Sequence, residues 1–417
     1  MIAEVDVAGL VGRYATRVHR LAGDGQHVVS PLGAWLIVAL CAPLAAGPDR
    51  DALVGVLGVD PETAAALAGR LVADPHPLVA AAAAVWTRPG WDTEALRAWK
   101  TALPAAVETG DIPSQGELDA WVRRHTLGLI VRFPVEITPQ VMLLMATALA
   151  TKVSWARPFD LAPGSALGPS SPWSTRLGQV LRAPVGDPRH VQFIADTAGA
   201  GMVAVHAARA RDGLQVTSVA AHPDVPALEV LAAAYRIAAA EAADPGSVER
   251  RSLFDLALGD GPLWAITEEQ ADTAERREER CGAVLPAWSA KFVLDLGHRE
   301  VGFPAAASAI AAALGIVDYR YDAVQSAVAR YSRVGFEAAA VTALAVAVAM
   351  RRRVLRPGVR RVAELRFGHP FAVVAVAVDD HTRPEKRGPW HGVPVFAAWV
   401  TEPTEPEEDA SPSQPRP

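Results

Sequence analysis

The stretch GFEAAAVTALAVAVAMRRR, residues 335–353, is the part of the sequence on which the fold assignment depends. Between Glu337 and Arg351 it contains thirteen consecutive uncharged residues, most of them small and apolar. From position 342 onward alanines occupy the odd positions, and larger residues occupy the even positions: Thr342, Leu344, Val346 and Val348. A period of two with the larger side chains on one side is typical of a β-strand. Alanine favours a helix, but three valines between positions 341 and 348 count against it, so a buried strand of a central sheet is the plainest interpretation.

The composition of the chain excludes several classes of protein. It has 417 residues, of which 51% are hydrophobic, enough for a large core in one big domain or two medium ones. A net charge of −6 argues against a general nucleic-acid binder. The two cysteines, Cys41 and Cys281, are too few for a disulfide framework or a zinc site, and we expect buried free thiols. No metal, nucleotide or hydrolase motif is present, so we expect no cofactor, no metal and no enzymatic activity.

The two ends of the chain carry their own signals. The first residues have apolar positions near helical spacing and predict an amphipathic helix rather than a signal peptide, which favours a cytoplasmic protein. No apolar run approaches the ~20 residues that span a membrane, so we expect no membrane partner. The stretch 402–417 is acidic and proline-rich and predicts a disordered tail over 404–417.

Helical patterns dominate early in the chain and strand patterns dominate late. This order favours an α+β domain over alternating βαβ units. Among the expected helices, the one at 268–279 carries many charges, so we expect it to have a solvated face. Helices are expected at 32–44, 61–71, 114–127, 229–241 and 268–279, and strands at 28–29, 78–86, 142–154, 371–380 and 393–400.

Laid out in this way, the chain resembles the serpin family from its first helix to Pro403. The resemblance rests on segments that occur in the family's order and spacing. They are QHVVSPLGAW (26–35), LVAAAAAVWTRPGW (78–91), LDAWVRRHTLGLI (118–130), TALATKVSWARPFD (147–160), LPAWSAKFVLDL (285–296), ALGIVDY (313–319), LRFGHPFAVV (365–374) and VFAAWVTEP (395–403). The resemblance implies an α+β serpin fold in a single domain over 1–403, with a central mixed β-sheet A, sheets B and C, about eight or nine helices and an exposed reactive-centre loop.

The resemblance places the opening run in the reactive-centre loop, at about 335–362. Serpins offer this loop as bait to a serine protease, and after cleavage and acylation the loop inserts into sheet A as a new strand with the protease attached. The chain would then act as a monomeric inhibitor whose partner is the target protease. The residues that correspond to the hinge are Gly335, Phe336, Glu337, Ala338, Ala339, Ala340, Val341 and Thr342.

Two positions for the bait bond follow from the resemblance. Counting from Gly335 places the bond between Ala349 and Met350, which suits an elastase-like protease. The alternative is a trypsin-like or subtilisin/kexin-like target at Arg351, Arg352 or Arg353. The arginine-rich segment that follows is longer than the usual serpin spacing. It is either a solvated extra loop or a basic docking surface, from Arg351 to Arg361, for an acidic partner or an anionic polymer.

Several residues depart from the inhibitory pattern. Phe336 stands where inhibitory serpins have Thr or Ser, and overpacking there would cost ~1–3 kcal/mol and slow the first step of insertion. Arg333 replaces a glutamate. In the polar cluster under sheet A, Ser30 is kept, whereas Gly33, Thr147 and Gln325 replace the usual residues, and Trp155 matches the tryptophan after the third strand. These departures favour an alternative, a non-inhibitory serpin-like protein with a binding, chaperone or regulatory role.

The source and location of the protein are expected from composition and resemblance alone. The sequence is rich in alanine and arginine and poor in lysine, which is typical of a high-GC genome and favours a bacterial origin. Many serpins act outside cells, so an extracellular location is the alternative to a cytoplasmic one.

Overall fold

The structure is a computed structural model that describes residues 6–77, 79–91, 93–210, 213–336, 356–379 and 387–406. The predicted hinge residues from Glu337 to Thr342 and the predicted bait residues from Ala349 to Arg353 lie outside these ranges. Of the predicted tail, residues 404–406 are described and are held in place, which corrects the expectation for them. Thr404 forms a β-bridge with Ala287, and the carboxylate of Glu405 accepts hydrogen bonds from the backbone N–H groups of Gly178 and Gln179.

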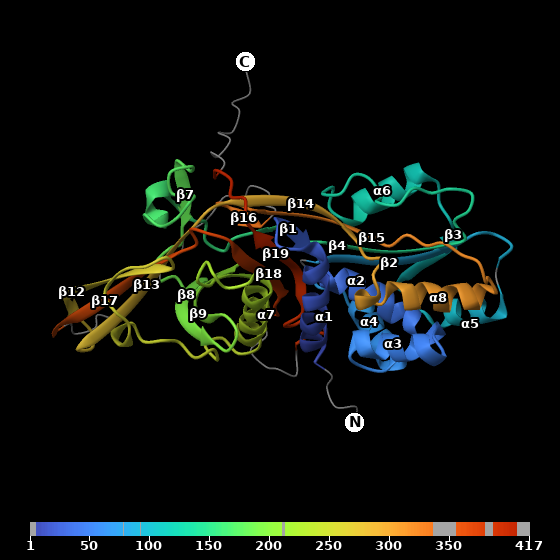
Figure 1. The fold of residues 1–417 in the computed structure, drawn as a ribbon, viewed down its shortest axis with the longest axis horizontal. Coiled ribbons are helices and arrows are strands. Elements are labelled where there is room, and N and C mark those ends of the chain that lie inside the picture. Colours follow the sequence, from blue (N-terminus) through green and yellow to red (C-terminus); the bar gives the residue numbers. More distant parts are fainter. Residues whose placement is uncertain are drawn as a thin grey trace, which may run out of the picture.

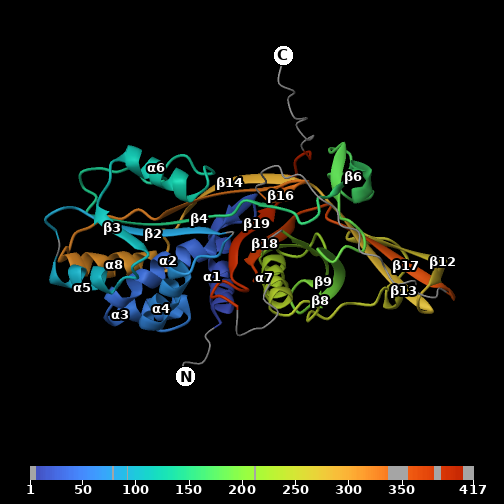
Figure 2. The same cartoon turned by 180° about the vertical axis from the view of Figure 1, so that it is seen from behind.

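Eight α-helices occur in the described ranges, and most of them gather against one face of the central sheet (Figure 1). Those on this face are α2 (Pro31–Cys41), α3 (Gly47–Leu57), α4 (Pro61–Ala73), α5 (Glu94–Ala102) and α8 (Phe303–Leu314). On the opposite face lies α6 (Gln115–His125), while α1 (Val7–Ala22) and α7 (Ala227–Ala243) lie near the middle of the molecule. Figure 2 shows the same arrangement from behind.

Local sequence explains where the helices next to the site begin. The Ser30 side chain accepts a hydrogen bond from the Gly33 N–H at the start of α2, and Pro31 occupies the first turn, where its missing N–H costs nothing. Ser114 and Glu117 form a reciprocal capping box at the start of α6. The predicted helices at 32–44, 61–71, 114–127 and 229–241 are therefore confirmed within a few residues.

The central sheet is divided into two parts. One part has the order β3 (Val107–Asp111), β2 (Ala80–Thr87), β4 (Leu143–Ala150), and the other has the order β14 (Trp288–Asp295), β15 (Val324–Tyr331), β16 (Gly335–Phe336), β5 (Val153–Ser154). Because β5 follows β4 after only two residues, the two parts are joined at one end of the sheet through β16. Over the rest of their length, β4 and β15 belong to different hydrogen-bonded sheets in the described structure.

A second sheet, which we call the closed sheet because its strands pair without a break from one edge to the other, is buried over most of its length. Its order is β1 (His27–Val29), β19 (Pro394–Val400), β18 (Phe371–Ala377), β10 (Leu214–Ala220), β9 (Gly201–Arg209), β8 (His190–Thr197). All residues of β10, β18 and β19 are buried, and α7 packs against β10 and β18. The strands predicted at 371–380 and 393–400 are confirmed as antiparallel neighbours.

A third sheet contains the arginine-rich segment and corrects two expectations. Its order is β11 (Gly259–Asp260), β12 (Trp264–Thr273), β17 (Arg356–Arg366), β13 (Arg277–Leu285), β7 (Gln179–Arg182), β6 (Asp160–Pro163). The helix predicted at 268–279 is wrong, because these residues form the end of β12, a turn and the start of β13. The predicted loop at 335–362 is also wrong at both ends, since residues 335–336 form β16 and residues 356–362 lie in β17. Both errors arise because long-range partners stabilise these strands.

Candidate functional site

A gap separates β4 from β15 in the central sheet. It contains a cavity of about 730 Å³. One wall is residues 140–148, which include most of β4, and the other is residues 318–326, which lead into β15. Residues of α2 and α8 form the floor. They include Gly33, Ile37 and Cys41 of α2, and Phe303 and Ile310 of α8. A second cavity, of about 20 Å³, continues the gap past Leu149 and Val328 to Phe336. The open space therefore runs along both strands and ends at β16.

The two faces of β4 differ, and they define the two faces of the gap. On the face toward α2, the Thr147 hydroxyl donates a hydrogen bond of 2.9 Å to the Gly33 carbonyl, and the Met145 sulfur lies 3.1 Å from the Cys41 Sγ. On the opposite face, Leu144, Ala146 and Ala148 pack in a cluster with Leu118, Trp121 and Val122 of α6. Even-numbered residues of β4 thus face α6, and Met145 and Thr147 face the core.

The closed end of the gap is built around β16. Phe336 is only 2% exposed, and it pairs with Tyr331 of β15 on one side and Val153 of β5 on the other. Its ring centroid lies 6.3 Å from that of Trp288 in an edge-on contact. The chain therefore already enters the sheet at this point, between the two strands that separate further on.

A tight turn at residues 332–335 sends the chain from β15 into β16. The Ser332 N–H donates to the Gly335 carbonyl at 2.9 Å, and the Gly335 N–H donates to the Ser332 hydroxyl at 3.2 Å. Trp155 holds this turn, because its indole N–H donates to the Ser332 carbonyl at 2.9 Å and its backbone N–H donates to the Val334 carbonyl at 3.0 Å. The structure thus brings together Trp155, which the resemblance placed with the polar cluster, and Gly335 and Phe336, which it placed in the hinge. Sequence reasoning missed Ser332, whose type alone gives no signal.

Phe336 does not meet the steric problem that the sequence suggested. We expected overpacking when this residue entered the sheet, with a slow first step of insertion. In the structure the side chain is already accommodated, against Trp288 and between Tyr331 and Val153. Phe336 is therefore already part of the central sheet in the described structure.

The polar residues predicted to lie under the sheet do come together, at the start of α2. The backbone N–H of Ser30 donates to the Gln325 Oε1 at 2.9 Å, and the Gln325 Nε2 donates to the Ser30 carbonyl at 2.8 Å. Thr147 reaches the same helix turn from the other side of the gap, through Gly33. A Cβ at Gly33 would lie 3.1 Å from the nearest Leu149 methyl and 3.4 Å from the Thr147 hydroxyl, so glycine permits this close approach. Both edges of the gap are therefore attached to α2 rather than to each other.

Two buried histidines lie close to the turn. His190 Nδ1 and His206 Nε2 are 3.2 Å apart, and the His190 ring centroid is 4.7 Å from that of Phe159, which also contacts Tyr331. Burial holds the pKa of His206 well below its ordinary value, and burial also lowers the pKa of His190. The pair is therefore uncharged at neutral pH and packs as part of an aromatic cluster.

Comparison with known proteins gives a result only at the level of structure. No family model matches the sequence, and no curated protein matches it. Among solved structures, Serpin48 from the insect Tenebrio molitor superposes with a TM-score of 0.60 at 13% identity over 97% of this chain and 100% of its own. The chain has the serpin fold. Human thyroxine-binding globulin in complex with thyroxine gives a TM-score of 0.60 at 13% identity over 96% of this chain and 99% of its own. The thermophilic serpin tengpin in its native state gives 0.59 at 11% identity over 96% and 95%.

Within the serpin fold, the divided central sheet corresponds to the expected sheet A, and the segment 337–355 connects its β16 to β17 in the third sheet. The predicted basic docking surface from Arg351 to Arg361 is described only from Arg356 onward. Arg360 and Arg361 lie 2.9 Å and 2.8 Å from the carboxylates of Glu269 and Glu268. Their charges are therefore largely compensated within the protein, and an anionic partner at this segment stays a prediction.

Other kinds of site have little support in the part of the chain that the structure describes. No group of three or more His, Cys, Asp or Glu side chains there is arranged to hold a metal ion. No single helix there is long and apolar enough to cross a bilayer, and only the bent pair of α3 and α4 reaches the required length and composition, when the two are taken together. Cys41 is buried and Cys281 is partly buried, and both are free.

Proposed function

We propose that this serpin-fold protein is a suicide inhibitor of a serine protease. The protease would cut the segment 337–355 and form an acyl bond to it, and the released end would enter the gap between β4 and β15 as a new strand. The observation that carries this proposal is the cavity of about 730 Å³ between β4 and β15, which the smaller cavity continues to β16, where the chain leading to the cut is already paired on both sides.

The pairing of Phe336 sets the register of the inserted strand. Phe336 lies opposite Tyr331 and Val153, and in antiparallel pairing each step forward along the new strand is a step backward along both neighbours. Continued in this way, Thr342 comes to lie opposite Gln325 and Thr147. It is the one polar residue between Ala338 and Met350. The register therefore supports insertion, since it brings this polar residue between the two polar side chains that edge the gap.

The same register explains why alanines alternate with larger residues in the sequence from position 342 onward. Residues opposite each other in neighbouring strands point to the same face, so Leu344 would share the core face with Met145. Val346 and Val348 follow on that face, while the intervening alanines would point toward α6. Large side chains would then fill the cavity above α2 and α8, and small ones would pass beneath α6.

The energy available from such insertion is large. Each buried Leu or Val contributes ~1.5–3 kcal/mol, and each new ladder hydrogen bond adds ~0.5–1.5 kcal/mol net. Summed over roughly a dozen residues, the gain is on the order of ten or more kcal/mol. A gain of this size is a plausible source of work for displacing and distorting an attached protease.

The dimensions of the cavity favour one of the two bait positions. In the register set by Phe336, both walls, 140–148 and 318–326, lie opposite positions 341–349 of the inserted strand. A cut between Ala349 and Met350 would therefore release a strand that ends where both walls end. A cut at Arg351, Arg352 or Arg353 would carry additional residues, one or more of them charged, beyond this space. We accordingly propose Ala349–Met350 as the bait bond and an elastase-like protease as the target.

The test is to mix the purified protein with elastase-, trypsin- and subtilisin-like proteases and to analyse the products on denaturing gels and by mass spectrometry. We expect an SDS-stable complex of summed mass with the elastase-like protease and a new N-terminus at Met350. The variant Ala340→Arg places a charge on the core face of the inserted strand and should be cut without trapping the protease. Val354→Arg lies beyond the bond and is the matched control, which should still trap it.

The alternative, a non-inhibitory binding or regulatory protein, is distinguished by the same experiment. Its main support was Phe336, which the structure accommodates in the sheet. Clean cleavage of the unaltered protein, with neither a complex nor a rise in thermal stability, would contradict inhibition and favour this alternative.

A further inference from the structure

The cavity between β4 and β15 extends to the end of the central sheet that lies away from β16, where α8 leads into β15 (Figure 1). Five consecutive residues there both line the cavity and are exposed: Asp318, Tyr319, Arg320, Tyr321 and Asp322. Residues that do both lie where a cavity meets the solvent. This segment, 318–322, therefore forms one side of an opening, and we call it the mouth.

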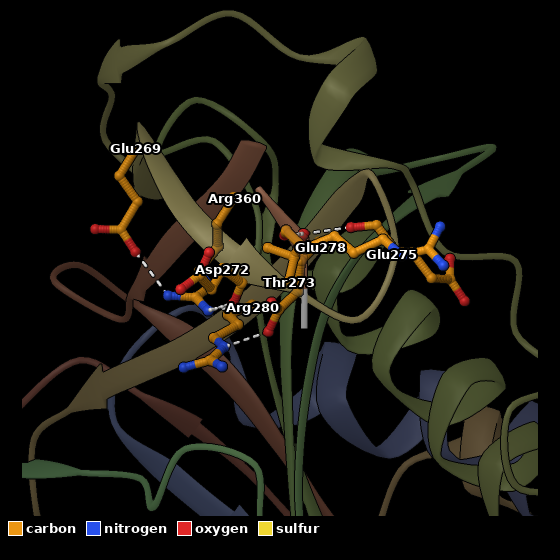
Figure 3. A network of polar contacts seen from close by, with 8 residues as sticks. Glu269, Asp272, Thr273, Glu275, Glu278, Arg280 and Arg360 are labelled. Carbon is orange, nitrogen blue, oxygen red and sulfur yellow. Dashed lines mark hydrogen bonds and ion pairs between the residues drawn. The ribbon is translucent and has the colours of Figure 1, made fainter. Parts of the chain in front are cut away.

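Arg320 provides the positive charge of the mouth. Within the described residues, no hydrogen bond or ion pair holds its guanidinium. Arg360 of β17 differs, because its guanidinium lies 2.9 Å from the Glu269 carboxylate and 3.1 Å from the Glu278 carboxylate (Figure 3). The charge of Arg360 is thus compensated inside the protein, whereas that of Arg320 is available to a ligand in the cavity.

Two carboxylates and two tyrosines surround this arginine in the sequence. Asp318 and Asp322 lie two positions before and after it, and Tyr319 and Tyr321, each 39% exposed, lie between. Carboxylates attract a cation by charge, and aromatic faces attract cations, quaternary ammonium groups included, through their π electrons. Arginine in contrast suits phosphate oxygens. The mouth therefore complements a head group that carries a phosphate and a quaternary ammonium side by side.

Both sides of the opening are held in place before any ligand binds. The Tyr321 hydroxyl donates a hydrogen bond of 2.9 Å to the Gly297 carbonyl. On the opposite wall, the Arg88 guanidinium donates to the carbonyls of Val141 and Thr138, at 2.9 Å and 3.2 Å, and both of these residues line the cavity. A site that is already ordered loses less free energy when its ligand binds.

The space behind the mouth suits a hydrocarbon chain. Its floor includes the apolar side chains of Ile37, Phe303 and Ile310. Further in, the Thr147 hydroxyl and the Gln325 amide are already bonded to backbone carbonyls at the start of α2. The wall from 318 to 326 extends over roughly 26 Å in extended geometry. The volume of about 730 Å³ also lies within the range of small-molecule sites, ~300–1,000 Å³.

We propose that this cavity binds a single-chain zwitterionic amphiphile in the uncut protein, with a phosphocholine-type head group at the mouth and the hydrocarbon chain between β4 and β15. Binding itself does not depend on the proposed function. One consequence rests on that function: a bound chain occupies the space that the cut segment would enter. The protein would then be cut without trapping the protease, so the amphiphile would act as a regulator of inhibition.

The test titrates the full, uncut chain with dodecylphosphocholine, below the concentration at which it forms micelles, in a calorimeter. Probes with the same chain and another head group are the controls: dodecanoate, dodecyltrimethylammonium and dodecyl maltoside. We expect one dodecylphosphocholine per protein chain, bound at least about tenfold more tightly than any control, and a raised unfolding temperature. No binding, many molecules per chain, or equal binding of all four probes would overturn the proposal.

Three variants test the placement of the ligand. Arg320→Gln should weaken binding of dodecylphosphocholine about tenfold and leave dodecyltrimethylammonium unchanged. Arg236→Gln, at an exposed position of α7 outside the cavity, is the matched control and should bind as the unaltered protein does. Ile310→Trp fills part of the floor and should weaken binding of every probe. Equal binding by the two arginine variants would refute the head-group site, and unchanged binding by Ile310→Trp would refute the chain site.

Addition of an elastase-like protease separates this inference from the proposed function. With dodecylphosphocholine bound, the fraction trapped as an SDS-stable complex should fall and the fraction merely cut should rise. Unchanged trapping by the saturated protein would show that the ligand does not occupy the gap. If the protein traps the protease but binds no probe, the ligand site is overturned and inhibition is retained. If it binds the probe but never traps the protease, the site is retained and the proposed function falls.

Discussion

The central sheet and the closed sheet of this protein show two ways to build a β-sheet from similar residues. In the closed sheet, β10, β18 and β19 are buried along their whole length and each pairs with a neighbour on both sides. In the central sheet, β4 and β15 are separated by a cavity and are attached separately to the start of α2. Apolar side chains are thus closely packed along these three strands of the closed sheet, whereas in the central sheet they line an open cavity. The unfilled space of the central sheet therefore lies between β4 and β15.

The largest expected effect comes from completing the central sheet. If the cut segment inserts, unfolding should require on the order of ten kcal/mol more than before the cut. Hydrogen exchange should then slow strongly in β4 and β15 and change little in β10 and β18. Exchange measured by mass spectrometry before and after cleavage checks this. Equal slowing in both sheets would mean that the gain is not local to the gap.

A matched pair of truncations should sharpen the comparison. Leu214 of the closed sheet is 1% exposed and Leu144 of β4 is 7% exposed, but Leu144 lines the large cavity. Leu→Ala in a core costs about 2–5 kcal/mol, and the cost grows with the empty volume that the change creates. We expect Leu214→Ala near the upper end of this range and Leu144→Ala near or below its lower end, measured by denaturant unfolding. Equal losses would show that the walls of the gap are as tightly packed as the closed sheet.

The smallest expected effect is a dependence on pH that belongs to the closed sheet. Burial lowers the pKa of His206 and of His190, so in the folded state they stay neutral at a pH where the unfolded chain binds protons. Stability contributed by the pair is present above the ordinary histidine pKa, near 6.5, and is lost as the pH falls below it, by up to about 1.4 kcal/mol per pH unit for each proton.

The variant His206→Asn tests this dependence. It should reduce the fall in unfolding free energy between pH 7.5 and pH 5.5, whereas Leu214→Ala, which removes no titratable group, should leave that fall unchanged. Urea unfolding at the two pH values measures both. An undiminished fall in His206→Asn would place the acid sensitivity elsewhere, for example in the second buried pair, His19 and His27, whose nitrogens are 2.8 Å apart.

Sequence reasoning succeeded where local signals and the fold agree. The capping box at Ser114 and the Ser30–Pro31 start of α2 fix helices through contacts within one turn, so a short window contains the whole cause. The resemblance also assigned Ser30, Thr147, Trp155 and Gln325 to the site, and this assignment stays a prediction. Their hydrogen-bond partners could not be read from the sequence, since these lie in distant segments.

It failed where the partner of a segment is far away in the chain. Residues 268–279 look like a solvated helix because eight of the twelve are charged, yet Glu268, Glu269 and Glu278 face arginines of β17 from about eighty to ninety positions later. Such compensation is invisible until the strands are paired. The argument about Phe336 failed for another reason: it assumed that this residue waits outside the sheet. The gap itself is a property of packing, and no local pattern predicts it.

The register set by Phe336 has a consequence for deletions in the segment that follows it. Since side chains of a strand alternate between faces, deleting one residue between Glu337 and Val341 would turn Thr342 and every later residue over, with alanines toward the core and leucine and valines under α6. Deleting two residues would restore each face and only shorten the reach. If the segment inserts as proposed, whether a change in its length is odd or even therefore decides which side chains reach the core face.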